Sequence, residues 1–388
     1  MQELLSANAR NFRPNTIRAF AKLINDPRVI SFAGGVPNPA TFPAERVAEI
    51  ASRLIRDRRE MALQYGPTLG LPRLREFVAG VCRGRGIECT ADEVMLTTGS
   101  QQALDLLAHV LLDPGDVVLV ELPTYVGGTS SFYARSATLA GVAQDDGGIV
   151  IDSLDEAARR VRPKLLYTIP NFQNPSGRLM RQDRRAEVLR AAGEHGFLVL
   201  EDDPYGELVY ADGVDNTPIA ARGKTIYLGS FSKVLAPGLR CGWIVAPKEL
   251  LAVLEVAKQA ADLCSGMLDQ SIVDEFCAAG ELAPQIARVR DFYRGKRATL
   301  LAAVEEHFGG RADWTPADGG LFTWLTLHDR SVDTAAFIER AVADGVAFIP
   351  GGPFFVDGSG RNTFRLTFAK EPDDRIREGV ARLARVFA

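Results

Sequence analysis

The sequence predicts an α/β protein with a mainly parallel sheet in a large domain and a smaller α+β domain. Between about residues 93 and 246, short apolar or β-branched runs alternate with helical patterns, which is typical of parallel strands joined by right-handed crossovers. After about residue 282, one long helical pattern leads into a strand-rich section. A chain of 388 residues is also too long for one small core and fits roughly two domains.

The large domain is expected to cover residues 46–280. A helical stretch over 248–276, with a break near Ser265 and Gly266, closes it before the boundary predicted at 277–282. The expected strands lie at 93–97, 116–121, 164–169, 197–201, 225–228 and 241–246, and the expected helices at 43–57, 72–83, 101–112, 154–161 and 181–195.

The small domain is expected to combine residues 1–45 with 281–388, so that the N-terminal segment packs on the C-terminal part. A short helical pattern covers residues 16–24. In the C-terminal part we expect helices at 283–307, 333–344 and 373–387 and strands at 321–327, 346–349 and 363–368.

Composition limits the classes of function. The chain is 46% hydrophobic and 24% charged, as in ordinary globular proteins, and has a net charge of −4. Without a run of Lys and Arg, we expect no nucleic-acid partner. The first ten residues have no basic end followed by an apolar run, and no stretch is long enough to span a bilayer, so we expect no membrane partner and a cytoplasmic location.

Cysteine and histidine spacing argues against a metal site. The five cysteines are odd in number and never form Cys-x-x-Cys, which argues against both a disulfide framework and a zinc site. The four histidines are far apart in the sequence, so no helical pair offers a metal clamp. We therefore expect reduced core thiols and no bound metal.

Lys233 is the first candidate for chemistry. It follows the strand expected at 225–228, where burial disfavours an ammonium group and yields an amine that can form an imine with an aldehyde. Ser230, Ser232 and Arg240 lie beside it and suit a phosphate group. An aldehyde that carries a phosphate describes pyridoxal 5'-phosphate. The alternative is that this stretch is an ordinary polar loop.

Two glycine turns add possible ligand contacts. The segment 97–101 feeds a helix N-terminus, where free N–H groups favour an anion. It lacks the Gly-x-Gly-x-x-Gly spacing of a dinucleotide site, which favours a simple phosphate. Gly34 and Gly35 follow a short apolar run and could bring backbone amides against a ligand, with an ordinary turn as the equal alternative.

Polar residues follow three further strand ends, where ligands bind in open α/β sheets. Asp202 or Asp203 can stabilise a protonated pyridine nitrogen, and only one of them should face the site because successive strand residues point to opposite sides. Asn174 and Tyr205 can donate to the ring oxygen, and Tyr125 can stack on the ring. Each residue alone could be a cap, a turn residue or core, but together they favour a pyridoxal phosphate site.

The chain resembles fold-type I pyridoxal phosphate-dependent aminotransferases of class I/II, in the aminoadipate/kynurenine aminotransferase-like branch. The order and spacing of the matching motifs are specific and run along nearly the whole chain. The motifs are Ile30-Ser-Phe-Ala-Gly-Gly-Val-Pro, Gln64-Tyr-Gly-Pro-Thr-Leu-Gly, Thr98-Gly-Ser-Gln-Gln-Ala-Leu, Thr168-Ile-Pro-Asn-Phe-Gln-Asn-Pro-Ser-Gly, Glu201-Asp-Asp-Pro-Tyr, Gly229-Ser-Phe-Ser-Lys and Asn362-Thr-Phe-Arg-Leu-Thr-Phe.

The resemblance implies roles for individual residues. It favours Asp202, with Tyr205, over Asp203 as the partner of the pyridine nitrogen. It implies that Tyr65 reaches the phosphate of a neighbouring subunit, so that a homodimer shares its active sites. The implied phosphate ligands are Ser100, Gln101, Ser230, Ser232 and Arg240.

The resemblance also implies a substrate site. Arg365 would bind the substrate α-carboxylate, with Asn174 and Gly35 beside it. Arg18 stands where an arginine of this branch can recognise a side-chain carboxylate, although a solvated helix face is the simpler interpretation.

The function that this implies is a ping-pong transfer of an amino group from an L-amino acid to a 2-oxo acid, through a Schiff base on Lys233 that acts as base and acid. A lyase, decarboxylase or racemase on the same fold is the alternative, since fold and cofactor do not fix which bond breaks. A remote alternative is the effector-binding domain of a transcription regulator. The aminotransferase-like pattern begins within about fifteen residues of Met1, which leaves too little chain for a DNA-binding module.

Overall fold

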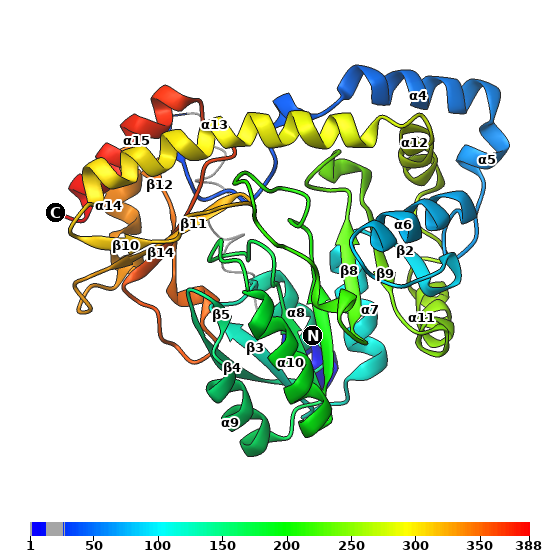
Figure 1. Ribbon diagram of the computed structural model, residues 1–388, viewed down its shortest axis with the longest axis horizontal. Coiled ribbons are helices and arrows are strands. Elements are labelled where there is room, and N and C mark those ends of the chain that lie inside the picture. The colour runs from blue at the N-terminus through cyan, green and yellow to red at the C-terminus, as the bar shows by residue number, and fades with distance from the viewer. Residues whose placement is uncertain (1, 13–25, 27) are drawn as a thin grey trace.

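The computed structural model describes residues 2–12, 26 and 28–388, so the predicted helix at 16–24 and Arg18 lie outside the described residues. Its main feature is an eight-stranded sheet of order β2-β9-β8-β7-β6-β3-β4-β5 (Figure 1). Pairs β3–β4, β3–β6, β6–β7 and β7–β8 are parallel, and β9 runs antiparallel to both of its neighbours. The strands are β2 Val94–Thr98, β3 Val117–Leu122, β4 Thr138–Asp145, β5 Gly148–Ile149, β6 Leu165–Thr168, β7 Leu198–Asp202, β8 Ile226–Ser230 and β9 Cys241–Val245. The predicted α/β class is thus confirmed.

Helices cover both faces of this sheet. Successive strand residues point to opposite faces, and they therefore belong to two different apolar clusters. Val118 and Val120 belong to one cluster, whereas Leu119 belongs to the other, together with Leu154 of α9 and Val188 of α10. The helices of this part are α4 Ala44–Asp57, α5 Arg59–Leu63, α6 Pro72–Gly84, α7 Ser100–Leu111, α8 Val126–Tyr133, α9 Ile151–Val161, α10 Gln182–His195, α11 Lys248–Ala261 and α12 Met267–Ala278.

The C-terminal part forms a second, smaller sheet with helices packed beside it. The 27-residue helix α13 runs across the molecule and joins the two parts (Figure 1). Beside it lies an antiparallel sheet of order β10-β11-β14-β13. Its elements are α13 Leu282–Phe308, β10 Ala312–Trp314, β11 Phe322–Leu327, α14 Ile338–Ala343, β12 Val346–Ala347, β13 Ile349–Pro350, β14 Thr363–Thr367 and α15 Asp373–Val386.

Residues 30–31 pack on this C-terminal part, whereas Asn8 and Asn11 are hydrogen-bonded to Ser136, which follows α8 in the large part. Strand β1, Ile30–Ser31, pairs in parallel with β12, and the Ser31 N–H donates to the buried Glu371 at 3.1 Å. Short helical turns complete the described chain. They are α1 Ala7–Arg10 and the 3-10 helices η1 Gln2–Leu4, η2 Pro39–Thr41, η3 Ala91–Glu93, η4 Ile219–Ala221, η5 Pro237–Leu239, η6 Thr334–Phe337 and η7 Gly352–Phe354.

Most predicted elements agree with the structure to within a few residues. The sequence did not predict α8, β4 and β5, which fall between the predicted strand at 116–121 and the predicted helix at 154–161, nor α5 and β10. The strand predicted at 346–349 is two short strands that pair with different partners, β1 and β14. The helix predicted at 333–344 begins as a 3-10 turn before α14.

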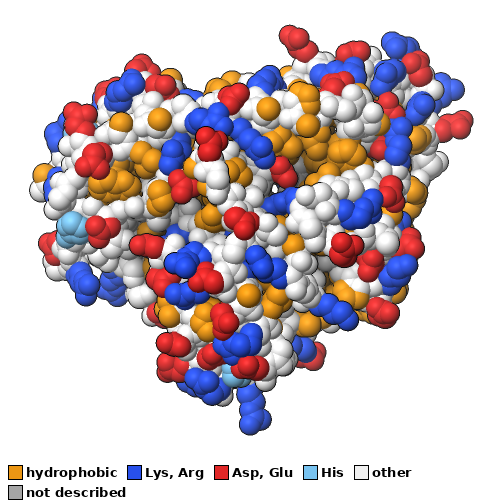
Figure 2. Space-filling view, viewed as in Figure 1, with side chains coloured by type: hydrophobic (Ala, Val, Ile, Leu, Met, Phe, Trp, Pro, Cys, Tyr) orange, Lys and Arg blue, Asp and Glu red, His pale blue; other side chains and the backbone are white. Residues whose placement is uncertain are grey.

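Two observations describe the surface. No helix in the described part of the chain is both long and apolar enough to cross a membrane. On the face in Figure 2, Lys and Arg side chains are interspersed with Asp and Glu side chains.

Candidate active site

The predicted site residues meet at one edge of the large sheet. The carboxyl ends of β6, β7 and β8 lie there, and since β9 is antiparallel, its first residue, Cys241, pairs with Thr98 at the end of β2. A cavity at this edge is lined by Ser100, Gln101, Leu104, Tyr125, Ile169, Asn174, Asp202, Pro204, Tyr205, Ser230, Ser232, Lys233 and Arg240.

Lys233 is a half-buried amine in this cavity. Burial lowers its pKa to about 8, and the nearby Arg240 and Arg365 guanidinium groups lower the pKa further, whereas Asp202 opposes them. Its Nζ donates to the Gly35 carbonyl at 3.4 Å and lies 5.8 Å from the Tyr205 ring centroid. Lys233 therefore supplies a neutral amine at a much lower pH than an ordinary lysine does.

Asp202 faces the cavity with one free oxygen. The Tyr167 hydroxyl donates to its Oδ2 at 2.9 Å, while Oδ1 is buried and has no hydrogen-bond partner among the described residues. Burial raises the pKa of Asp202 to about 7. A protonated ring nitrogen at Oδ1 would satisfy this oxygen and favour the ionised carboxylate.

Asp203 points away from the cavity. Its Oδ2 lies 2.6 Å from Nη1 of Arg85 and accepts a hydrogen bond from the Tyr227 hydroxyl at 3.1 Å. The two neighbouring aspartates therefore face opposite sides, and Asp203 belongs to a buried ion pair.

Arg365 is a buried guanidinium whose contacts with the described residues are all with neutral groups. It donates to Asn174 Oδ1 at 2.7 Å and to the Ala33 carbonyl at 2.8 Å, and it stacks 4.3 Å from the Phe322 ring centroid. Its Nε has no partner among the described residues, and burial lowers its pKa to about 10. A carboxylate ligand would supply the missing counter-charge.

Asn174 and Tyr205 lie together beside Arg365. Both side chains are buried, and both line the same cavity. Burial raises the pKa of the Tyr205 phenol, which keeps it a neutral donor. Tyr125 caps the start of α8, and its ring lies so close to Gly127 that a Cβ there would come within 2.3 Å of it.

A second set of groups forms a turn whose free donors suit an anion. Gly99, at φ 73°, caps α7, and the Arg240 guanidinium packs on it so closely that a Cβ would lie 2.4 Å from Nη2. Arg240 itself has a left-handed backbone at φ 46°, a strained conformation of the kind found at functional sites. The Ser230 hydroxyl donates to that of Ser232 at 2.8 Å. Ser100 opens α7 next to this turn, where the helix N-terminus favours an anion.

Gln101 lines the cavity, but its side-chain amide nitrogen already donates hydrogen bonds to other residues. It donates to the Gly127 carbonyl at 3.0 Å and to the Ser131 hydroxyl at 2.9 Å. These contacts tie α7 to α8 at the mouth of the cavity.

Of the two remaining predicted residues, Gly35 lies beside Lys233 and Arg365, whereas Tyr65 lies apart from the cavity. Gly35 contributes its carbonyl to Lys233, and a Cβ on it would lie 3.2 Å from the Phe322 ring and 3.9 Å from Arg365. Tyr65 is 77% exposed and does not line the cavity of its own chain.

Sequence reasoning missed a buried carboxylate that supports the site. Glu121 on β3 accepts hydrogen bonds from Thr168, from the Ile169 N–H and from the Gln173 amide at 2.6–3.0 Å. Gln173 directly precedes Asn174, so Glu121 anchors the segment that carries it. The signal in the sequence was a lone Glu inside an apolar strand.

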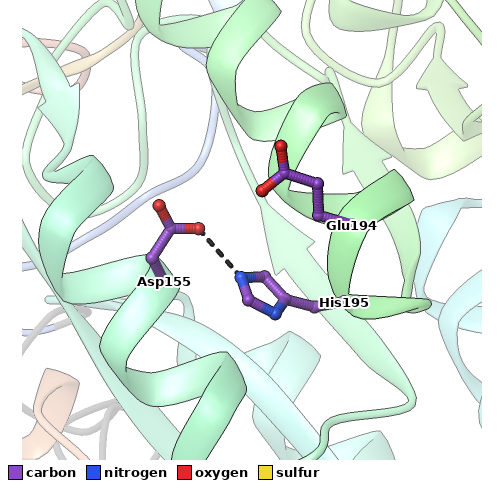
Figure 3. A group of neighbouring side chains, drawn as sticks. All are labelled: Asp155, Glu194 and His195. Carbon is purple, nitrogen blue, oxygen red and sulfur yellow. Dashed lines mark hydrogen bonds and ion pairs between the residues drawn. The ribbon is translucent and has the colours of Figure 1, made fainter.

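One group of potential metal ligands lies away from the cavity. Asp155 of α9 and Glu194 and His195 of α10 place ligand atoms within 4.8 Å of one another, and Asp155 is hydrogen-bonded to His195 (Figure 3). Arg190 already forms ion pairs with Asp155 and Glu194. The cluster is therefore explained as a charge-compensated helix contact.

The cavity meets the needs of one cofactor. An amine of lowered pKa suits an aldehyde, the free oxygen of Asp202 suits a protonated ring nitrogen, and the turn at Gly99 suits a phosphate. The fold and the cavity therefore define a pyridoxal phosphate-dependent enzyme.

Comparisons with known proteins identify the family. The model of aminotransferase class I and II matches residues 27–383, and the chain belongs to this family. It is 40% identical to aromatic-amino-acid aminotransferase 1 of Thermococcus litoralis, over 99% of this chain and 94% of that protein. The chain is a pyridoxal phosphate-dependent aminotransferase.

Solved structures agree with this assignment. Kynurenine aminotransferase of Pyrococcus horikoshii matches with a TM-score of 0.94 and 39% identity, covering 99% of this chain and 97% of that one. Alpha-aminoadipate aminotransferase of Thermus thermophilus, complexed with N-(5'-phosphopyridoxyl)-L-leucine, matches with a TM-score of 0.91 and 41% identity over 99% and 97% of the two chains. The fold is therefore that of fold-type I enzymes.

Proposed function

We propose that this aminotransferase binds the α-carboxylate of its amino donor on Arg365 and moves the α-proton with Lys233. The observation that carries the proposal is the presence, in and beside one cavity, of an amine with a pKa of about 8 and a buried guanidinium that contacts only neutral groups among the described residues. Pyridoxal phosphate, when bound, supplies the aldehyde and the electron-withdrawing ring.

The remaining roles follow from the same contacts. Asp202 would hold the proton of the ring nitrogen through Oδ1, and Asn174 and Tyr205 would donate to the ring oxygen. Tyr125 would cover the ring face. The phosphate would bind Ser100, Gln101, Ser230, Ser232 and Arg240, the groups around the turn at Gly99.

For the donor, we propose an L-amino acid with a large or aromatic side chain and a 2-oxo acid as acceptor. Phe322 and Phe354 both lie within 5.3 Å of the Arg365 guanidinium, so the described surroundings of the proposed carboxylate site are aromatic. The relatives are named for aromatic amino acids, kynurenine and aminoadipate. Arg18 would add selectivity for an acidic side chain.

A donor panel tests this proposal. Wild type and Arg18→Ala are assayed with aromatic, branched and acidic donors against 2-oxoglutarate and pyruvate. Loss confined to acidic donors would support a selective role for Arg18, while equal loss on all donors, or none, would remove it. In a single half-reaction without acceptor, one equivalent of 2-oxo acid per site excludes lyase, decarboxylase and racemase chemistry.

We also propose a cytoplasmic homodimer in which Tyr65 reaches the phosphate of the neighbouring subunit. The exposure of Tyr65 supports a contact outside its own chain, and five free cysteines fit a reducing compartment. Within each subunit we propose a large domain of residues 46–280 and a small domain of residues 1–45 and 281–388, supported by the pairing of β1 with β12.

A further inference from the structure

A fully buried lysine lies behind the proposed phosphate site. Lys258 of α11 is 0% exposed, and its Nζ contacts both carboxylate oxygens of Asp262 at 2.8 and 2.9 Å, Gln102 Oε1 at 2.9 Å and Ser265 Oγ at 3.0 Å. Asp262 and Ser265 belong to the connection between α11 and α12, whereas Gln102 lies in the first turn of α7. The lysine thus joins two segments that are about 160 residues apart in the sequence.

The network continues from Lys258 to the turn that precedes α7. Gln102 Oε1 also accepts the Thr98 N–H at 2.8 Å, and the Gln102 amide donates to Asp262 at 2.6 Å. The Thr98 hydroxyl lies 3.2 Å from Asp262 Oδ2 and 3.0 Å from Ser265 Oγ. Both the backbone N–H and the side chain of Thr98 are therefore held by residues that do not line the cavity.

The opposite side of the same turn contacts Arg240. The Thr98 carbonyl accepts from Arg240 Nη2 at 3.2 Å, and Gly99 leaves no room for a side chain beneath that guanidinium. A shift of the turn would therefore move Ser100 at the helix N-terminus and Arg240 together. Because a buried charged network is costly when one member is missing, each contact depends on the others.

We propose that Lys258 is a positioning residue for the cofactor phosphate, acting through Gln102 and Thr98 on the turn that carries Gly99 and Ser100. Lys258 does not line the cavity itself. The inference depends on the proposed phosphate role of Ser100, Gln101 and Arg240.

The test compares two forms of the cofactor. Lys258→Met and the matched control Lys248→Met are freed of cofactor, and their dissociation constants for pyridoxal phosphate and for pyridoxal are measured by equilibrium dialysis. Lys248 is on the same helix but is exposed and pairs with Asp92 at 3.0 Å. We expect Lys258→Met to bind pyridoxal phosphate about tenfold more weakly, the loss of one charge-assisted hydrogen bond, and pyridoxal within about twofold of wild type. The control should leave both constants unchanged.

A purely structural role would give a different result. Equal weakening of both ligands, or no weakening, in folded Lys258→Met would overturn the proposal. Gln102→Met removes the oxygen that accepts hydrogen bonds from Lys258 and Thr98, at a half-buried position. It should show the same selective loss of pyridoxal phosphate affinity. If Lys258→Met does not fold, the result for Gln102→Met decides between the two roles.

Arg240→Met separates this inference from the proposed phosphate site. If Arg240→Met binds both ligands as wild type does, the assignment of the phosphate site is wrong. Arg240→Met could instead lose affinity for pyridoxal phosphate alone while Lys258→Met keeps its affinity for both ligands. In that case the assignment of the phosphate site is supported and the proposed role of Lys258 is wrong.

Discussion

Asp202 and Asp203 are neighbours in the sequence with different partners. Asp202 leaves one buried oxygen free in the cavity, while Asp203 is fully buried against Arg85 at 2.6 Å. Asp202→Asn should lower kcat/KM by about 10²–10³-fold, because an amide cannot stabilise a protonated ring nitrogen, with little change in the free energy of unfolding. Steady-state kinetics and denaturant unfolding measure the two effects.

Asp203→Asn is the matched control, and its effects should be reversed. It leaves the Arg85 guanidinium without its buried counter-charge, so we expect a loss of about 3 kcal/mol in the free energy of unfolding. Turnover per folded molecule should stay close to that of wild type. If Asp203→Asn abolishes turnover in a stable protein and Asp202→Asn does not, the assignment of the ring-nitrogen partner is wrong.

The pKa of Lys233 predicts a pH dependence for cofactor uptake. Since burial lowers this pKa to about 8, the amine is neutral above about pH 8, rather than only near the ordinary pKa of 10.5. The rate at which the cofactor-free enzyme binds pyridoxal phosphate covalently should rise with pH and level off above about 8. Borohydride trapping at a series of pH values measures this rate. A rate that still rises steeply between pH 9 and 10 would contradict the lowered pKa.

Replacing Lys233 tests its role directly. Lys233→Ala removes the amine that holds the aldehyde and moves the α-proton, so turnover should fall by at least about 10⁴-fold. Pyridoxal phosphate should still bind without a covalent bond, because the groups around Gly99 remain. Borohydride should then leave no cofactor on the chain. An active Lys233→Ala enzyme would disprove the assignment.

At the scale of elements, the segment after β6 depends on a buried carboxylate. Glu121 satisfies the Ile169 N–H and the Gln173 amide, and Asn174 follows directly. Glu121→Leu leaves these donors unpaired, and we expect it to cost about 2–4 kcal/mol in the free energy of unfolding. The shift of Asn174 beside Arg365 should also raise KM for the amino donor by about tenfold, the equivalent of about 1.4 kcal/mol.

Glu201→Leu provides the control for Glu121→Leu. Glu201 is equally buried and accepts two backbone hydrogen bonds, from Ile219 and Ala220 at 2.9 and 2.8 Å. It should lose similar stability without the change in KM. Equal changes in KM for the two variants would show that Glu121 acts through stability alone.

The sequence predicted six of the eight strands of the large sheet and the residues at their ends, because buried strands and the turns after them have local signals. It did not predict α8, whose Val126-Gly-Gly-Thr start has low helix propensity, or β4, which includes Gly141 and is mostly not buried. Both are stabilised by packing on distant segments. The roles of Glu121, Arg85 and Lys258 were not predicted for the same reason, since each has a partner far along the chain. Thr168, Asp203 and Gln102 are 47, 118 and 156 residues away, respectively.

At the scale of the whole molecule, the question is whether one site needs two chains. Tyr65 precedes a tight turn in which a Cβ on Gly66 would lie 2.0 Å from the Met267 sulfur, so the segment is fixed on α12 while the Tyr65 ring is exposed. A rigid, exposed tyrosine fits a contact with a second copy of the chain. We therefore expect Tyr65→Ala to weaken pyridoxal phosphate binding, and sedimentation to show a dimer.

Mixing Tyr65→Ala with Lys233→Ala tests whether the site is shared, at a pyridoxal phosphate concentration low enough that Tyr65→Ala alone is inactive. If Tyr65 completes the partner's site, a hybrid of one Tyr65→Ala chain and one Lys233→Ala chain contains one site with both defects and one site with neither. Random reassembly of equal amounts makes half of the dimers hybrids, so about a quarter of all sites should be intact. Activity should return to about a quarter of the wild-type value after the mixture is unfolded and refolded together, and not when the variants are refolded separately and then assayed in one tube. No recovery in a mixture shown to contain hybrids would place Tyr65 outside the partner's site, while leaving the role of Lys233 untouched.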